Sequence, residues 1–177
     1  MSRRRCLLAV AAAGILLLMT SLRGGAPRLV WNASSSVPLG LYRVEPGPVR
    51  RGDLVLIRPP PAVAELAHRR GYLPKSIYLI KYVWAIPGDQ VCRFGTYVLV
   101  RGMLVVRALP RDNLGRRMPV WRGCRTLRSG EFFVLAYSPQ SFDSRYFGLV
   151  PVTSVMGRAV LIYPASPATA GATISTI

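Results

Sequence analysis

The segment that most limits how this chain can fold is the apolar run 77–86, which contains one charged residue, Lys81. Its aromatic and β-branched content predicts a β-strand, and Pro87-Gly88 marks its end. Side chains alternate along a strand, and both faces of this one are apolar. The lysine therefore either lies buried and loses its proton, or lies at a strand edge with its amine in water. Lowering a lysine pKa from about 10.4 to about 7.5 corresponds to roughly 4 kcal/mol, which implies a use for the buried form.

Turn residues divide the rest of the chain into shorter strands. Strands are expected near 41–44, 53–57, 98–100, 104–107, 132–136 and 155–163. Pro61 predicts the first turn of a helix that ends at Gly71. With 177 residues, the chain is long enough for one domain. We therefore expect a mainly β domain over 24–163 with one or two short helices, and a flexible tail over 164–177.

The N-terminus predicts export. Arg3, Arg4 and Arg5 precede an apolar run from Cys6 to Met19, which uncharged residues extend to Arg23. A basic flank before such a run is typical of a signal sequence whose N-terminus stays in the cytoplasm. The run is near the lower limit for spanning a bilayer, about 17 residues. The absence of a small-x-small site favours an uncleaved transmembrane anchor over 1–23, with a cleaved signal peptide as the alternative.

Basic residues dominate the charge, with 24 Lys and Arg against 7 Asp and Glu and a net charge of +17. The arginines are scattered, and no helix-turn-helix, zinc-finger or aromatic RNA-binding signature accompanies them. We therefore expect no nucleic-acid partner. Attraction to an anionic membrane surface is favoured over nucleic-acid binding, and an arginine-rich coding bias is the other explanation of the charge.

Two cysteines, Cys92 and Cys124, lie in the part expected outside the cytoplasm, where disulfides form. Closing that loop of about 33 residues would stabilise the fold by roughly 3–4 kcal/mol. Two separate buried thiols are the alternative. Cys6 lies in the apolar N-terminal run, and the sequence contains no CxxC or His/Cys ligand set. No metal or cofactor is expected.

A neutral lysine can serve as a general base for a serine nucleophile. The only histidine, His68, lies beside Arg69 and Arg70 in the expected helix, where a surface position is the simpler interpretation. Ser36 precedes Val37-Pro38-Leu39-Gly40, a turn that can present a side chain, although the same pattern occurs in ordinary loops.

A further polar segment, Ser138 to Gly148, contains one acidic and one basic residue that are both candidates for the site. Asp143 and Arg145 would lie on one side of an extended segment and could form a structural salt bridge.

The order of these segments resembles the four boxes of the signal peptidase I superfamily of serine-lysine proteases. The boxes are Asn32 to Tyr42, Arg51-Gly52-Asp53-Leu54-Val55, Ile80 to Asp89, and Ser141 to Gly148. Within the superfamily, Pro38 follows Ser36 by two positions rather than three, which is similar to the conjugal-transfer peptidases of the TraF type.

This resemblance implies Ser36 as nucleophile and Lys81 as general base. It also implies that Ser34 contributes to the oxyanion site, that Ser141 orients the lysine, and that Asp143 and Arg145 form a supporting ion pair.

The implied fold is a signal-peptidase-like twisted antiparallel β-domain on the periplasmic side of the inner membrane, or free in the periplasm if the signal is cleaved. The implied activity is processing of exported precursors, above all maturation or cyclisation of a conjugative pilin. The resemblance also implies other conjugative transfer proteins as partners. A general signal peptidase and a non-catalytic assembly component of the transfer apparatus are the alternatives.

Overall fold

The structure is a computed structural model that describes residues 27–165. The anchor predicted over 1–23 and all but the first two residues of the tail predicted over 164–177 lie outside the described residues. Pro164, placed in that tail by the prediction, is the last residue of a strand. Within residues 27–165, no helix combines the length and the apolar character needed to cross a bilayer.

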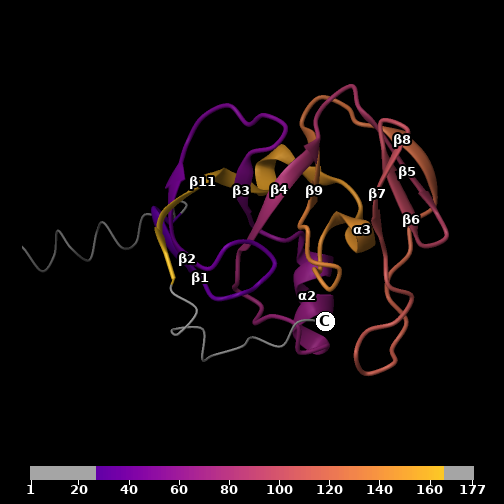
Figure 1. Cartoon of the computed structure of the whole chain (residues 1–177), viewed down its shortest axis with the longest axis horizontal. Helices are drawn as coiled ribbons and strands as arrows, with labels where there is room; N and C mark the ends of the chain where they lie inside the picture. Colours follow the sequence, from indigo (N-terminus) through magenta and orange to yellow (C-terminus); the bar gives the residue numbers. More distant parts are fainter. Residues whose placement is uncertain (1–26, 166–177) are drawn as a thin grey trace, which may run out of the picture.

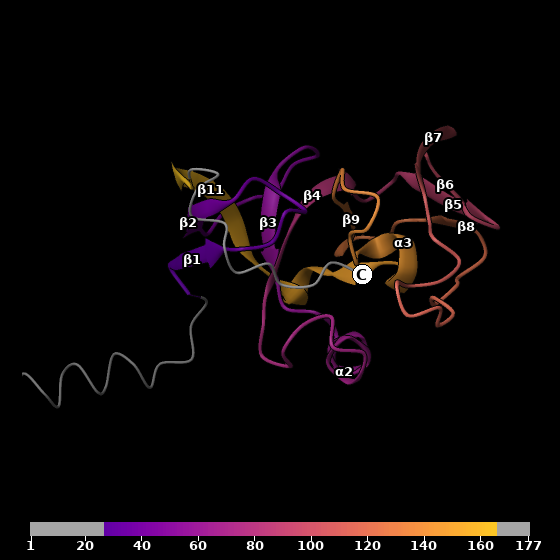
Figure 2. The same ribbon diagram turned by 60° about the horizontal axis from the view of Figure 1, so that its bottom comes forward.

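The larger of two sheets has seven strands in the order β1-β2-β11-β3-β4-β9-β10, and every neighbouring pair is antiparallel. Its strands are β1 Leu29–Asn32, β2 Gly40–Glu45, β3 Leu54–Ile57, β4 Leu79–Ala85, β9 Glu131–Leu135, β10 Val150–Pro151 and β11 Val155–Pro164. The sheet is curled, with β1, β2 and β11 at one end of the molecule (Figures 1 and 2).

The smaller sheet has four antiparallel strands in the order β7-β6-β5-β8 and lies at the opposite end of the molecule (Figures 1 and 2). Its strands are β5 Gln90–Phe94, β6 Tyr97–Val100, β7 Met103–Arg107 and β8 Gly123–Thr126. The whole sheet is an insertion between β4 and β9, which pair directly with each other. A disulfide joins Cys92 of β5 to Cys124 of β8, which are partners in the strand register. The predicted disulfide is therefore confirmed.

Two short α-helices, α2 Pro61–Arg69 and α3 Ser144–Phe147, accompany the sheets, together with the 3₁₀ helix η1 Val152–Ser154. Pro61 is at the first position of α2, and Gly71 follows its end with a φ of +71°. This left-handed conformation is easily reached by glycine and ends the helix as expected. The expectation of a mainly β fold with one or two short helices is thus confirmed.

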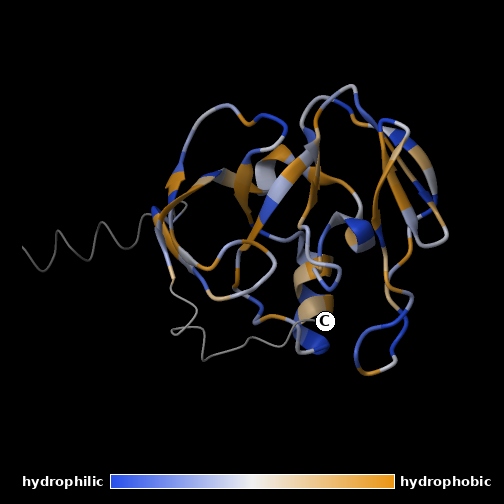
Figure 3. Ribbon diagram, in the orientation of Figure 1, coloured by the Kyte–Doolittle hydropathy of each residue, from blue (hydrophilic) through white to orange (hydrophobic). Residues whose placement is uncertain are grey.

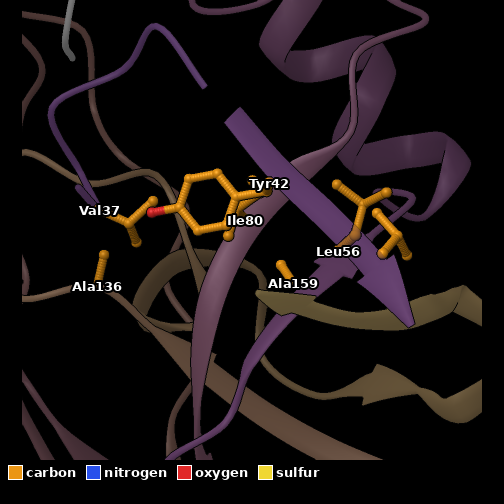
Figure 4. Packing of buried hydrophobic residues seen from close by; sticks show 7 residues of the cluster. Val37, Tyr42, Leu56, Ile80, Ala136 and Ala159 are labelled. Carbon is orange, nitrogen blue, oxygen red and sulfur yellow. The ribbon is translucent and has the colours of Figure 1, made fainter. Parts of the chain in front are cut away.

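Strand β4 lies in the interior of the larger sheet, between β3 and β9. One buried cluster packs beside it and includes Val37, Tyr42, Leu56 and Ile80. Figure 4 shows the Tyr42 ring next to Ile80, with its hydroxyl directed toward Val37. The loop that holds Ser36 is therefore tied to the core by its neighbour Val37.

Several predicted bounds were wrong. The strand expected over 77–86 begins at Leu79, because the amide of Ile77 closes a turn onto the carbonyl of Pro74. Four strands, β1, β5, β8 and β10, were not predicted. The segment containing Asp143 and Arg145 was expected to be extended, but Asp143 caps α3 and Arg145 lies inside that helix. The capping carboxylate accepts the backbone N–H of Arg145, which starts the turn.

Candidate active site

Lys81 is buried, with 3 % of its surface exposed. It lies opposite Val55 in the register between β3 and β4, and its strand neighbours Leu79 and Val83 belong to a buried apolar cluster. The edge position considered for this lysine is therefore excluded. Burial lowers the pKa of Lys81 from 10.5 to about 8; the carboxylate of Asp143 opposes this shift and the guanidinium of Arg145 adds to it. With this pKa, about a tenth of the amine is neutral at pH 7 and about half at pH 8, and the neutral form has a free lone pair.

The Lys81 amine contacts two serine hydroxyls from distant parts of the chain. Its Nζ atom is 3.0 Å from the Oγ atom of Ser36 and 2.8 Å from the Oγ atom of Ser141. Ser36 lies in the loop between β1 and β2, and Ser141 in the loop between β9 and α3. Both serines are buried, Ser141 almost completely. A neutral amine between two hydroxyls can accept a proton from one while the other fixes its orientation.

Ser34 adds a third hydroxyl to this cluster. Its Oγ atom is 3.0 Å from the Oγ atom of Ser36 and donates to Oδ1 of Asn32 over 3.2 Å. The hydroxyl lies beside Ser36, where it can reach an oxygen that becomes negative on a bound carbonyl after turning away from its present partners.

Asn32 organises the nucleophile loop and was missed as a functional residue by the sequence analysis. Its Nδ2 group shares two hydrogens among the carbonyl oxygens of Ser34, Val37 and Pro38, at 2.9, 3.2 and 3.0 Å. Its Oδ1 atom accepts the backbone N–H of Ser34 at 3.1 Å. The sequence offered only a weak signal, an asparagine just before a serine-rich turn, since asparagine side chains commonly bond the backbone of a following turn.

A second support for the loop comes from Tyr42. Its hydroxyl donates to the carbonyl oxygen of Pro38 over 2.7 Å. Burial, with a smaller effect of the nearby Tyr82, raises the pKa of Tyr42 to about 12, so the phenol remains a donor. The carbonyl of Pro38 is therefore held by two side chains, one from each strand of the hairpin.

Asp143 and Arg145 form a fully buried two-point ion pair. Nε and Nη2 of Arg145 lie 2.8 and 2.9 Å from the two carboxylate oxygens of Asp143. Arg145 also donates to the carbonyls of Ala136 and Pro139, and Asp143 accepts the backbone N–H of Ala136. The pair thus closes the loop 136–145 that presents Ser141 to Lys81. Removing one partner would leave a buried charge uncompensated.

His68 lies exposed on α2, and no hydrogen bond of residues 27–165 joins it to Ser36 or Lys81. In this same part of the chain, no group of three His, Cys, Asp or Glu side chains is placed to hold a metal ion. The chemical groups brought together are therefore three hydroxyls, one amine and one ion pair. A serine hydroxyl next to a buried lysine is the arrangement of serine-lysine hydrolases.

Comparison with known proteins agrees with this class. Residues 3–164 match the family described as signal peptidase, peptidase S26. The chain therefore belongs to the peptidase S26 family, whose members are serine proteases.

Three TraF proteins share about a third of their residues with the chain. The conjugal transfer protein TraF of Agrobacterium fabrum is 33 % identical over 94 % of this chain and 100 % of its own length. A plasmid transfer protein TraF of Escherichia coli is 34 % identical over 82 % of this chain and 88 % of its own length. A probable conjugal transfer protein TraF of Sinorhizobium fredii is 37 % identical over 75 % of this chain and 76 % of its own length. Within the S26 family, the chain is thus a TraF-type peptidase.

A solved signal peptidase I of Enterococcus faecalis covers 64 % of this chain and 98 % of its own, at 19 % identity and a TM-score of 0.37. That likeness is too weak to bear on the fold.

Proposed function

We propose that the chain is a membrane-anchored serine-lysine endopeptidase that processes exported precursors, with a conjugative pilin as its main substrate. The observation that carries the proposal is the contact of the buried Lys81 amine with the Ser36 hydroxyl. The TraF relatives, which are conjugal or plasmid transfer proteins, support the choice of substrate.

In the proposed reaction, the Ser36 oxygen attacks the scissile carbonyl while its proton moves to Nζ of Lys81. Ser141 holds the amine in position through its hydroxyl. The negative oxygen that forms would accept hydrogen bonds from the Ser36 backbone N–H and from the Ser34 hydroxyl. Lys81 then returns the proton to the departing amine, which leaves an acyl group on Ser36.

The acyl group can leave by two routes. Water attack, with Lys81 again taking a proton, gives a free carboxylate and a linear product. Attack by an amine of the same substrate gives a new peptide bond and a circular product. Both routes return Ser36 to its hydroxyl form and need no further reactant.

The proposed location is the inner membrane, with the described domain on the periplasmic side. It rests on the sequence of residues 1–23, a basic flank followed by an apolar run. Cleavage of this segment would place the same domain free in the periplasm.

The experiment is co-expression of the full-length chain with a pilin precursor, followed by mass analysis of the precursor. We expect a shortened product. It is either linear or, if it is circular, one water lighter than the linear product of the same cut. Ser36→Ala and Lys81→Ala should leave it uncut, and His68→Ala, which alters an exposed side chain away from the site, should process it like the wild type. Full processing by Lys81→Ala would refute the serine-lysine mechanism. Processing of general secretory precursors but not of pilin would refute the proposal that pilin is the main substrate.

A further inference from the structure

A groove of about 800 Å³ lies at the end of the small sheet, beside the loop that connects β7 to β8. That loop projects from the molecule at the lower right of Figure 1 and is mostly hydrophilic (Figure 3). The side chains that matter for its chemistry are Arg93, Phe94, Arg111, Arg117, Val120 and Arg122. We call this groove the arginine groove. None of these residues belongs to the serine-lysine site.

The positive charge of the arginine groove is not neutralised by the protein. Arg111, Arg117 and Arg122 are exposed, and none forms an ion pair with any of residues 27–165. All seven acidic residues of the sequence fall within this range. Six of them are ion-paired with other basic residues, and Asp53 accepts the backbone N–H of Arg50. No acidic side chain of the sequence is therefore paired with the groove, and a bound molecule can supply the counter-charge.

Arg93 places a buried guanidinium in the wall of the groove, where it can bind an anion. The residue is 2 % exposed, yet it has no carboxylate partner among the described residues. Its Nε and Nη1 groups donate to the backbone carbonyls of Gly95, Pro119 and Arg145. Among residues 27–165, the hydrogen bonds of Arg93 come from Nε and Nη1 alone, and the residue lines the groove. A buried guanidinium with one nitrogen left over favours a carboxylate or phosphate oxygen at that point.

The walls of the groove show which anion fits. Phe94 and Val120 line it with exposed apolar side chains, at 56 % and 53 %. A polypeptide with alternating acidic and apolar residues satisfies the arginines and these walls together. A single-stranded nucleic acid needs several aromatic platforms for successive bases, and the groove offers one aromatic ring.

The position of the groove also disfavours a membrane surface as its occupant. The described chain begins next to β1, at the opposite end of the molecule from the small sheet (Figures 1 and 2). If residues 1–23 are the anchor, the chain meets the bilayer at the β1 end, and the groove lies at the opposite end of the molecule.

We propose that the arginine groove binds an acidic polypeptide segment, whose carboxylates contact Arg93, Arg111, Arg117 and Arg122 and whose apolar side chains contact Phe94 and Val120. The partner is defined by this chemistry, and its binding does not require the serine-lysine site to be active.

The test is fluorescence anisotropy with the full-length chain in neutral detergent and a labelled peptide of repeated Glu-Glu-Leu units. The groove variant combines Arg111→Gln, Arg117→Gln and Arg122→Gln. The matched control combines Arg50→Gln, Arg69→Gln and Arg128→Gln, which remove the same charge from exposed positions elsewhere. We expect the groove variant to bind about thirtyfold more weakly, from about threefold per lost contact, and the control to change by less than about threefold.

Two further arms make the result decisive. Phe94→Ser should weaken the Glu-Glu-Leu peptide several-fold and leave a Glu-Glu-Gly peptide unchanged, because only the former has apolar side chains for the wall. Equal losses in the groove and control variants would overturn the proposal, since they would indicate general charge attraction. A wild-type chain that does not bind the peptide would also overturn it. So would groove-dependent binding of oligothymidine or of phosphatidylglycerol vesicles without groove-dependent binding of the peptide.

Discussion

Replacing Lys81 by methionine should stabilise the folded protein relative to the wild type, and the gain should shrink as the pH rises. The cause is the lowered pKa of the buried amine, 10.5 in an exposed lysine and about 8 in the fold. Between these two values the unfolded chain binds a proton that the folded chain does not. The wild-type free energy of unfolding therefore increases with pH through this window.

The magnitude follows from the difference of the two pKa values. At pH 7 the lysine destabilises the fold by about 3 kcal/mol, since each pKa unit corresponds to about 1.4 kcal/mol. At pH 9.5 the remaining penalty is about 1.4 kcal/mol by the same relation. The stability difference between Lys81→Met and the wild type should thus fall by about 2 kcal/mol from pH 7 to pH 9.5. Methionine also loses the hydrogen bonds to Ser36 and Ser141. This loss changes the stability difference by an amount that does not depend on the titration of the lysine.

Urea unfolding of both proteins at several pH values measures this difference directly. Titrations that the two proteins share, such as those of the tyrosines, cancel in the comparison. Lys75→Met is the matched control, because it removes the only other lysine, whose side chain is 62 % exposed. Its difference from the wild type should change by less than about 0.5 kcal/mol. A stability difference for Lys81→Met that stays constant from pH 7 to pH 9.5 would refute the desolvated-amine argument.

Three further results are expected. Asn32→Asp should lower kcat/KM for precursor cleavage at least as much as Asn32→Ala, because a carboxylate cannot donate to the loop carbonyls and places a negative charge beside them. A fully active Asn32→Asp would contradict the role of the Asn32 amide in organising the nucleophile loop. Gly40→Ala should destabilise the fold by more than about 3 kcal/mol, since its φ is +143° and a Cβ atom would lie 2.2 Å from the carbonyl oxygen of Tyr163; an unchanged thermal midpoint would contradict the close packing there. Replacing Cys92 and Cys124 by alanine should lower the free energy of unfolding by about 3–4 kcal/mol, measured by urea titration, and a loss below about 1 kcal/mol would show that the loop is already restrained.

The sequence predicted the elements whose side-chain pattern is explained by burial. Strand β4 and strand β11 are long apolar segments, and Pro61 and Gly71 marked the ends of α2. Lys81 is conspicuous in the sequence because a charge inside an apolar run is costly unless the fold uses it.

The missed elements depend on contacts that no local pattern encodes. Strands β5 and β8 carry Arg93 and Arg125, and β8 has no apolar alternation, so their strand form depends on pairing through the register of Cys92 and Cys124. The helix α3 has four residues and starts because the Asp143 side chain caps it. The Asp143–Arg145 pair was expected from an extended segment, yet it forms across a helical turn.

Asn32 shows a similar limit at the site itself. Its side chain bonds backbone atoms of residues two, five and six positions later. Such contacts exist only after the loop has closed, so the residue type alone did not reveal the role.

The site is assembled from three segments that are far apart in the chain: Lys81 follows Ser36 by 45 positions, and Ser141 follows Lys81 by 60. In an unfolded chain the lysine is exposed and charged at neutral pH, so Ser36 has no base. In the completed larger sheet, the amine is out of water and next to the serine. Folding itself would then switch the proposed enzyme on.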